Sequence, residues 1–80
     1  MSTQQFHVHL VRVDSSRRMA RFYQLSLEPT IFGDVAVARS WGRLGTRGRM
    51  RLDLFHDQRT ALEHLLNMVL RKKGKGYRPG

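Results

Sequence analysis

Residues 39–49 read RSWGRLGTRGR, and this stretch decides how the chain folds. Just before its glycines, VAVARSW at 35–41 starts with residues that are apolar on both faces, as in a strand at the centre of a sheet. After them, RMRLDLF at 49–55 alternates between charged and apolar residues, as a strand does. The glycines of GRLGTRG at 42–48 favour a turn. The stretch therefore predicts two strands joined by a turn that opens at Gly42.

The strand at 49–55 separates two kinds of side chain by its alternation. Its apolar residues point to one side of the sheet: Met50, Leu52 and Leu54. Its charged residues point to the other side: Arg49, Arg51 and Asp53. We expect these arginines to face water or a partner.

Upstream, FHVHLVRV at 6–13 and MARFYQLSL at 19–27 read as two strands joined by the polar turn at 14–18, which predicts a hairpin. Pro29 ends the second strand because proline cannot donate to a ladder. Gly33 marks the next turn.

Downstream, a helix is predicted from Gln58 to about Lys73. Asp57 is its N-cap and Gly74 follows its last turn. One apolar stripe at helical spacing is expected to face the sheet: Ala61, Leu62, Leu65, Leu66 and Val69. The tail at 75–80 is short, and we expect it to be only partly ordered.

The pattern is that of an α+β protein with four antiparallel strands followed by one helix that covers one face. We expect a single domain over residues 1–80, with its core at about 6–77. Hydrophobic residues make up 40% of the chain, which suffices for a compact domain but not for an enclosed substrate cavity as well. This composition argues against an enzyme.

The net charge of +9 points to a polyanionic partner, most commonly nucleic acid. Most of the basic residues are arginines, which favour phosphate contacts and stacking. The absence of cysteine excludes disulfides and thiolate chemistry. No signal-like or membrane-spanning apolar run occurs, so we expect a cytoplasmic protein that does not contact a membrane.

The order of these features resembles the WGR domain, over nearly the whole chain from about Phe6 to Tyr77. The resemblance rests on Trp41-Gly42-Arg43 with the two glycines that follow, on RFYQLSL at 21–27 upstream, and on KKGKGY at 72–77 after the helix. It implies a four- or five-stranded antiparallel sheet with a helix on one face. It also implies binding of DNA at breaks, as in poly(ADP-ribose) polymerases; the roles of the small bacterial members are less settled.

Carried over by position, the tryptophan and arginine that meet the DNA near its end are Trp41 and Arg43. In the polymerases they also help to relay binding to a catalytic domain, and none follows in this chain. The family often has glutamine where this chain has Arg49, which adds charge but changes any specific polar contact.

Several arginines surround the glycine turn and form a candidate phosphate-binding patch with its backbone. They are Arg39, Arg43, Arg47, Arg49 and Arg51, together with Gly42. A second basic cluster begins in the last turn of the helix and consists of Arg71, Lys72, Lys73, Lys75 and Arg78. Its candidate contacts are Lys73 and Lys75, although cations in the last turn also suit the helix dipole.

Trp41 has two interpretations. It could stack on a terminal base, or it could be a core residue. Strand parity puts it on the same face as Arg39, which favours an outward position, but a bulge before Gly42 would reverse this.

No catalytic or metal site is expected, and no cofactor. His7 and His9 share a strand face, but no third ligand has a motif spacing. The serines have no nucleophile signature around them, and the glycine run from 42 to 48 lacks the ending of a phosphate-binding loop and joins strand to strand.

The first hypothesis is a non-catalytic, monomeric module that binds DNA through the phosphate backbone, with ends or breaks as a further target. The alternative is a regulatory module that uses the same Trp-Arg surface to bind an acidic protein partner. An RNA preference is a third hypothesis.

Overall fold

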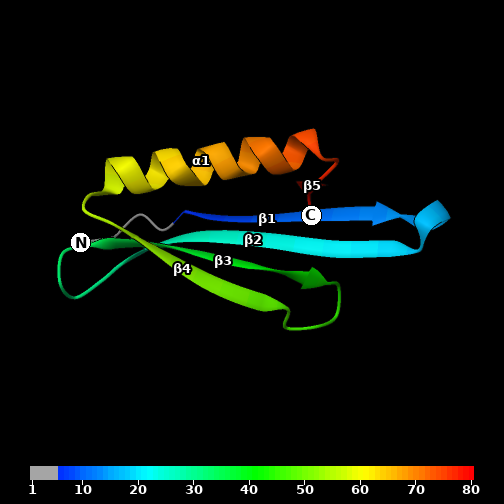
Figure 1. The fold of residues 1–80 in the computed structure, drawn as a ribbon, viewed down its shortest axis with the longest axis horizontal. Coiled ribbons are helices and arrows are strands. Elements are labelled where there is room, and N and C mark those ends of the chain that lie inside the picture. Colours follow the sequence, from blue (N-terminus) through cyan, green and yellow to red (C-terminus); the bar gives the residue numbers. More distant parts are fainter. Residues whose placement is uncertain (1–5) are drawn as a thin grey trace.

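The computed structural model describes residues 6–80, so residues 1–5 of the predicted domain lie outside the described part. Five strands form one sheet in the order β4-β3-β2-β1-β5, and one helix lies across it (Figure 1). The elements, with a short 3-10 turn η1, are β1 (His7–Asp14), η1 (Ser15–Arg17), β2 (Met19–Pro29), β3 (Val35–Arg43), β4 (Arg49–Phe55), α1 (Gln58–Gly74) and β5 (Arg78–Pro79). The predicted α+β class is confirmed, with five antiparallel strands and a C-terminal helix on one face.

The fifth strand comes from the tail, which was predicted to be only partly ordered. Arg78 and Pro79 pair with β1, and the Gly80 amide donates to the His9 carbonyl at 3.1 Å. The turn into this strand uses Gly76, whose φ of +97° lies in the left-handed region. Gly76, and not the predicted Gly74, therefore supplies the left-handed residue after the helix.

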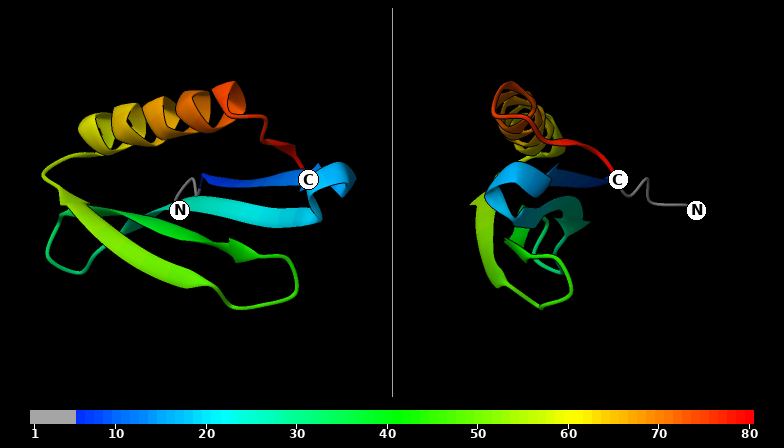
Figure 2. Two further views of the ribbon diagram at one scale, coloured as in Figure 1. Left: turned by 45° about the vertical axis from the view of Figure 1, so that its right-hand side comes forward. Right: turned by 90° about the vertical axis from the view of Figure 1, so that its right-hand side faces the viewer.

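The core lies between α1 and the one sheet face that the helix covers (Figure 2). Asp57 caps α1 as predicted, since its carboxylate accepts from the Thr60 amide at 2.8 Å. Of the predicted stripe, Leu66 is exposed and Met68 packs against the core in its place. The buried core residues are Leu10, Tyr23, Leu25, Leu27, Val35, Val37, Ala61, Leu65 and Tyr77.

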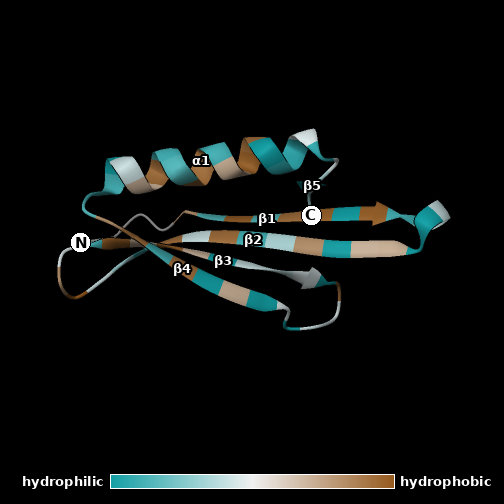
Figure 3. Ribbon diagram, viewed as in Figure 1, coloured by the Kyte–Doolittle hydropathy of each residue, from teal (hydrophilic) through white to brown (hydrophobic). Residues whose placement is uncertain are grey.

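The strand β4 keeps its predicted alternation of hydrophilic and hydrophobic residues (Figure 3). The helix, however, lies on the side of the charged residues. The register pairs Val37 of the core with Asp53, so the odd-numbered residues of β4 share the helix face. The apolar residues of β4 point away from the helix and are exposed: Met50, Leu52 and Leu54.

The turn between β3 and β4 begins later than predicted, because β3 continues to Arg43. Gly42 lies within the strand, opposite Phe22. A Cβ on Gly42 would lie 2.7 Å from the Gly48 Cα, and a Cβ on Gly48 would lie 2.1 Å from the Trp41 carbonyl oxygen. The two backbones touch at the base of the turn, and this contact requires glycine on both sides.

Candidate functional site

Three arginines form a row across three neighbouring strands. Arg12 of β1 pairs with Arg21 of β2, and Arg21 pairs with Arg43 of β3. Directly opposite residues of antiparallel strands project from the same face. Here that is the helix face, since two residues further along β2 and β3 the pair on the same face is Tyr23 with Trp41. We call Arg12, Arg21 and Arg43 the open arginine row.

This row has no acidic partner among residues 6–80, because no carboxylate oxygen lies within 4.0 Å of its nitrogens. Arg12 contributes only a minor part of the lowered pKa of Asp14, whose main cause is a hydrogen bond from the Ser16 hydroxyl. Like charges directly opposite each other in a sheet are destabilising. The fold therefore keeps a cost at this row that a bound anion would relieve.

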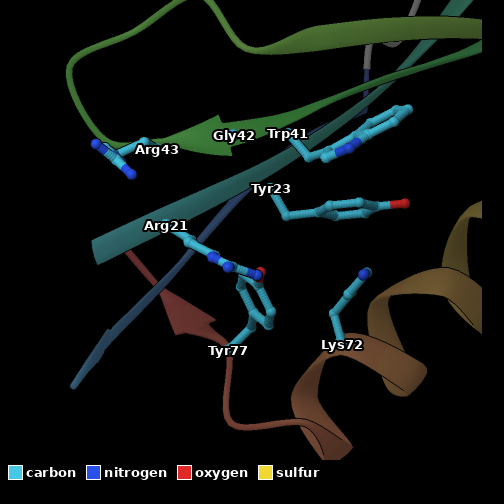
Figure 4. A pocket seen from close by; sticks show the side chains of 7 residues that line it. All are labelled: Arg21, Tyr23, Trp41, Gly42, Arg43, Lys72 and Tyr77. Atoms are coloured by element: carbon cyan, nitrogen blue, oxygen red, sulfur yellow. The ribbon is translucent and has the colours of Figure 1, made fainter. Parts of the chain in front are cut away.

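A pocket of about 360 Å³ opens beside the row, between the sheet and the last turns of α1 (Figure 4). We call it the Trp41 pocket. It is lined by Arg21, Tyr23, Trp41, Gly42, Arg43, Lys72 and Tyr77. Three of these residues are cationic, three are aromatic and none is acidic. This combination suits a ligand that is both planar and anionic.

The aromatic side chains of the pocket pack on one another. The Tyr23 ring lies 6.3 Å from the Trp41 ring and 6.2 Å from the Tyr77 ring, which meets it edge-on. Tyr77 is buried and packs the tail back onto the sheet. The Tyr23 hydroxyl is buried without a hydrogen-bond partner among the described residues, so the site holds an unused polar group.

Trp41 is neither fully exposed nor fully buried. It shares a face with Arg39, as its parity predicted, but that face carries the helix, so the inference of an outward position was wrong. One part of the indole packs against the core, and the rest lines the pocket. The Arg39 guanidinium carbon lies 5.8 Å from the indole centre. Trp41 can therefore support the fold and present a surface to a ligand at once.

Arg39 differs from the open arginine row because it has an acidic neighbour. Its Nε lies 3.1 Å from Asp53 Oδ2, a close ion pair whose N–H is not aimed for a hydrogen bond. Arg51 Nε and His64 Nε2 also lie 3.4 Å from the same carboxylate. We call Arg39, Arg51, Asp53 and His64 the Asp53 cluster. The side chains of Arg39 and Asp53 are only 17% and 21% exposed, so this arginine is engaged within the fold.

Lys72 lies over two aromatic rings of the pocket, with its Nζ 4.4 Å from the Tyr23 ring centre and 5.5 Å from that of Tyr77. Burial lowers the pKa of Lys72, and repulsion from Lys75, Arg39 and Arg71 adds to this. Its charge is therefore poorly compensated by the protein. An anion in the pocket would favour the protonated form.

The structure brings several of the predicted residues together. Gly42, Trp41 and Arg43 line the pocket, and Arg49 lies opposite Trp41 on β4. Arg51 follows on the same face, opposite Arg39. The remaining predicted contacts are exposed but do not line the pocket: Arg47, Lys73 and Lys75.

Sequence reasoning missed Arg12 and Arg21, and it placed Lys72 in the second basic cluster without making it a candidate contact. The first two could have been found from the register of the predicted hairpin, because the short turn at 14–18 places residue 12 opposite residue 21. Lys72 carried no separate signal, since a cation in the last turn of a helix suits the helix dipole.

Over the described residues, no three His, Asp or Glu side chains gather as metal ligands would, and no helix is long and apolar enough to cross a membrane.

Trp41, Gly42 and Arg43 of the sequence motif line the pocket, and Gly42 also takes part in the glycine contact. A comparison with known protein families covers the whole described chain. The model of the WGR domain matches residues 6–80. The chain belongs to the WGR domain family. The WGR domain is a small module, and these comparisons indicate no catalytic family.

A relative of this WGR domain is "Uncharacterized protein y4dW" of Sinorhizobium fredii (strain NBRC 101917 / NGR234), which is 40% identical over 79 residues. The match covers 99% of the chain and 39% of the relative, so the chain spans well under half of that protein's length. No solved structure matches the chain.

Proposed function

We propose that this WGR domain is a non-catalytic module that binds nucleic acid, and most specifically a phosphorylated end of duplex DNA. The observation that carries the proposal is the open arginine row beside an aromatic pocket. Arg21 and Arg43 face each other across two strands with no carboxylate between them, at the rim of the pocket that Trp41 lines. Phosphate is the anion that arginine binds best, through paired N–H donors.

The aromatic residues of the pocket would bind the other part of the ligand, its terminal base or sugar. The indole of Trp41 offers its exposed part to a terminal base or sugar, and base stacking of this kind contributes about 1–3 kcal/mol. Lys72 lies across the pocket from Trp41 in Figure 4 and supplies a third cation. The 360 Å³ volume suits one nucleotide end, with the rest of the duplex outside.

The duplex beyond the end would run along β4. Arg49 and Arg51 lie on the same face as Trp41 and are exposed, so they can contact successive backbone phosphates. Arg47, in the exposed turn, extends this basic edge. Arg39 takes another part in the proposal: it holds Trp41 from the side and does not contact phosphate.

Trp41 fluorescence tests the proposal, because Trp41 is the only tryptophan. The probes are short duplexes that are 5′-phosphorylated, unphosphorylated or closed by hairpins at both ends. We expect quenching with the phosphorylated end at the lowest concentration, and weaker affinity as salt rises. Equal binding of the open and hairpin-closed duplexes would refute the preference for ends, and binding that ignores salt would refute phosphate contact.

A competition experiment separates this function from the use of the surface by an acidic protein. Polyglutamate and single-stranded RNA are titrated against the labelled duplex. We expect both to compete more weakly than DNA, because neither presents a stacked duplex end with a terminal phosphate. Polyglutamate that competes as well as DNA would assign the surface to acidic proteins.

A further inference from the structure

The strand β4 has an open edge. It lies at the end of the sheet and pairs only with β3 among the described strands, whereas the opposite edge strand β1 is partly covered by β5 (Figure 1). On the side away from the helix β4 also exposes three apolar side chains: Met50 at 69%, Leu52 at 57% and Leu54 at 64%. An exposed edge strand with an apolar side is a template for pairing with another strand.

The charges on the other side of β4 specify which strand fits. If a second copy of β4 pairs antiparallel about Leu52, each Leu52 lies opposite the other, and Arg51 of each copy lies opposite Asp53 of the other. On the apolar side Met50 lies opposite Leu54 of the second copy. Both contacts between Arg51 and Asp53 of the two copies form together with all three apolar contacts, and they add to the pairing of Asp53 with Arg39, Arg51 and His64 of its own copy.

Neighbouring registers lose this match. A one-residue slip puts charged residues on the apolar side. A two-residue slip in one direction sets Arg51 against Arg51, although it also sets Arg49 against Asp53 of the other copy, and in the other direction it sets Asp53 against Asp53. Like charges directly opposite each other oppose pairing. Among these registers, only the one about Leu52 pairs opposite charges without placing two like charges opposite each other.

We propose that two copies of this domain associate through β4, with Leu52 at the two-fold axis, to form one continuous sheet of ten strands. This replaces the monomer expected from the sequence. The axis runs perpendicular to the sheet, so both helices lie on the same side. The exposed arginines of both copies, Arg49 and Arg51, then form one continuous basic strip between the two Trp41 pockets.

The apolar contacts of the dimer lie on the face away from the pocket, whereas Arg51 lies on the face that the proposed function assigns to the duplex. The tests below are made without nucleic acid, so their outcome does not depend on the proposed function. The dimer would form at high protein concentration, since two bodies of net charge +9 repel each other. About 0.3 M salt shortens the range of this repulsion to about 6 Å, and this is the condition for the tests.

Cysteine cross-linking tests the register directly, because the chain has no cysteine of its own. In the proposed register Leu52→Cys places two Cα atoms about 4.5–5.5 Å apart, within the range of a disulfide. Leu54→Cys, the matched control on the same face, leaves its two copies roughly 13 Å apart. We expect mild oxidation to link the Leu52→Cys protein and not the Leu54→Cys protein. Equal linking of both variants, or of neither, would overturn the register.

Sedimentation of two charge variants tests the ion pairs. Arg51→Glu faces Asp53 of the second copy and should make the domain monomeric at concentrations where the wild type dimerises. Arg59→Glu removes the same charge from an exposed site at the start of α1, so it lowers the general repulsion without touching β4. We expect Arg59→Glu to dimerise at least as well as the wild type. A wild type that stays monomeric at the solubility limit, or equal behaviour of the two variants, would refute the proposal.

Discussion

The Asp53 cluster and the open arginine row lie on the same face of the sheet, about 13 Å apart along β3, and they differ in one respect. The Asp53 cluster places Arg39, Arg51 and His64 around a carboxylate, and its Arg39 and Asp53 are half-buried. The open arginine row has no carboxylate within ion-pair distance among residues 6–80. The Asp53 cluster has its counter-ion within the protein, whereas the open arginine row keeps an uncompensated positive charge that favours an external anion.

This difference in acidic neighbours assigns different roles to arginines that are equivalent in the sequence. Arg39 and Arg43 are four residues apart on one strand and were equal candidates for phosphate contact. Their neighbours across the sheet decide their roles, since Arg39 has Asp53 within 3.1 Å and Arg43 faces Arg21. Arg39 is also directly opposite a cation, Arg51, but Asp53 pairs with both of them. An arginine beside a carboxylate supports the fold, and an arginine without one is available for a ligand.

The largest expected effect comes from replacing two arginines of the open arginine row. The double variant Arg21→Ala/Arg43→Ala should lose about 100-fold in affinity for a phosphorylated duplex, since each charged hydrogen bond contributes about 1.5 kcal/mol. The slope of log affinity against log salt should fall by about 2. Stability should stay equal or rise, because a like-charge pair is removed.

Fluorescence titration over a salt series measures this change, with urea unfolding beside it. The matched control is Arg17→Ala/Arg59→Ala, which removes two exposed charges away from the pocket. Should the control lose as much affinity as the double variant, the row would have no special role. Should the double variant unfold, the row would be structural.

The second-largest effect is expected from a substitution that disrupts the Asp53 cluster. Asp53→Asn leaves Arg39 half-buried without its counter-charge, and we expect a loss of about 2 kcal/mol in the free energy of unfolding, below the value for a fully buried pair. Duplex binding should change little, or tighten. Glu63→Gln, at an exposed site on α1, is the control and should be neutral in urea unfolding. Equal stability of the two variants would remove the distinction between the rows.

Trp41→Ala tests the residue that stands between the rows. Because Trp41 is half-buried, we expect a stability loss of about 1.5 kcal/mol, less than for a core tryptophan, and a loss of roughly tenfold in affinity from the missing stack. The anisotropy of a labelled duplex gives the affinity, and thermal unfolding gives the stability. Normal affinity in a folded variant would restrict Trp41 to a packing role.

The smallest effect concerns Lys72 and pH. Because the pKa of Lys72 is lowered in the folded state, the unfolded chain keeps this proton to higher pH. Stability should therefore rise with pH from the folded pKa up to the ordinary value near 10.5. Lys72→Met should abolish this contribution and weaken duplex binding by less than about tenfold. Urea unfolding of both proteins between pH 8 and about 10.5 measures the difference, and parallel profiles would contradict the account.

Much of the fold follows from local patterns. Alternation predicted all four long strands within two residues of their ends, and Asp57 marked the start of α1. The fifth strand escaped prediction because two residues carry no periodicity. The sequence patterns also did not predict which side of the sheet the helix covers. The apolar side of β4 looked equally suited, and only the register with β3 puts Arg49 and Asp53 on the side of the leucines of β1 and β2.

The candidate site was predicted in part for the same reason. The residues near the glycine turn were found by their proximity in sequence, and Trp41, Gly42 and Arg43 do line the pocket. Arg21 and Lys72 come from distant segments, and their position depends on pairing and helix packing that composition cannot reveal.

The contact between Gly42 and Gly48 has a consequence for how this family can vary. The two residues continue the register of β3 and β4 beyond Trp41 and Arg49, so their contact helps to set which side of β4 meets the helix. A larger residue at either position would push the turn apart and shift that register. Variation in Trp41 or Arg43 alters what a relative binds, whereas Gly42 and Gly48 should be inherited as a pair. In related sequences the two glycines should be kept together or lost together.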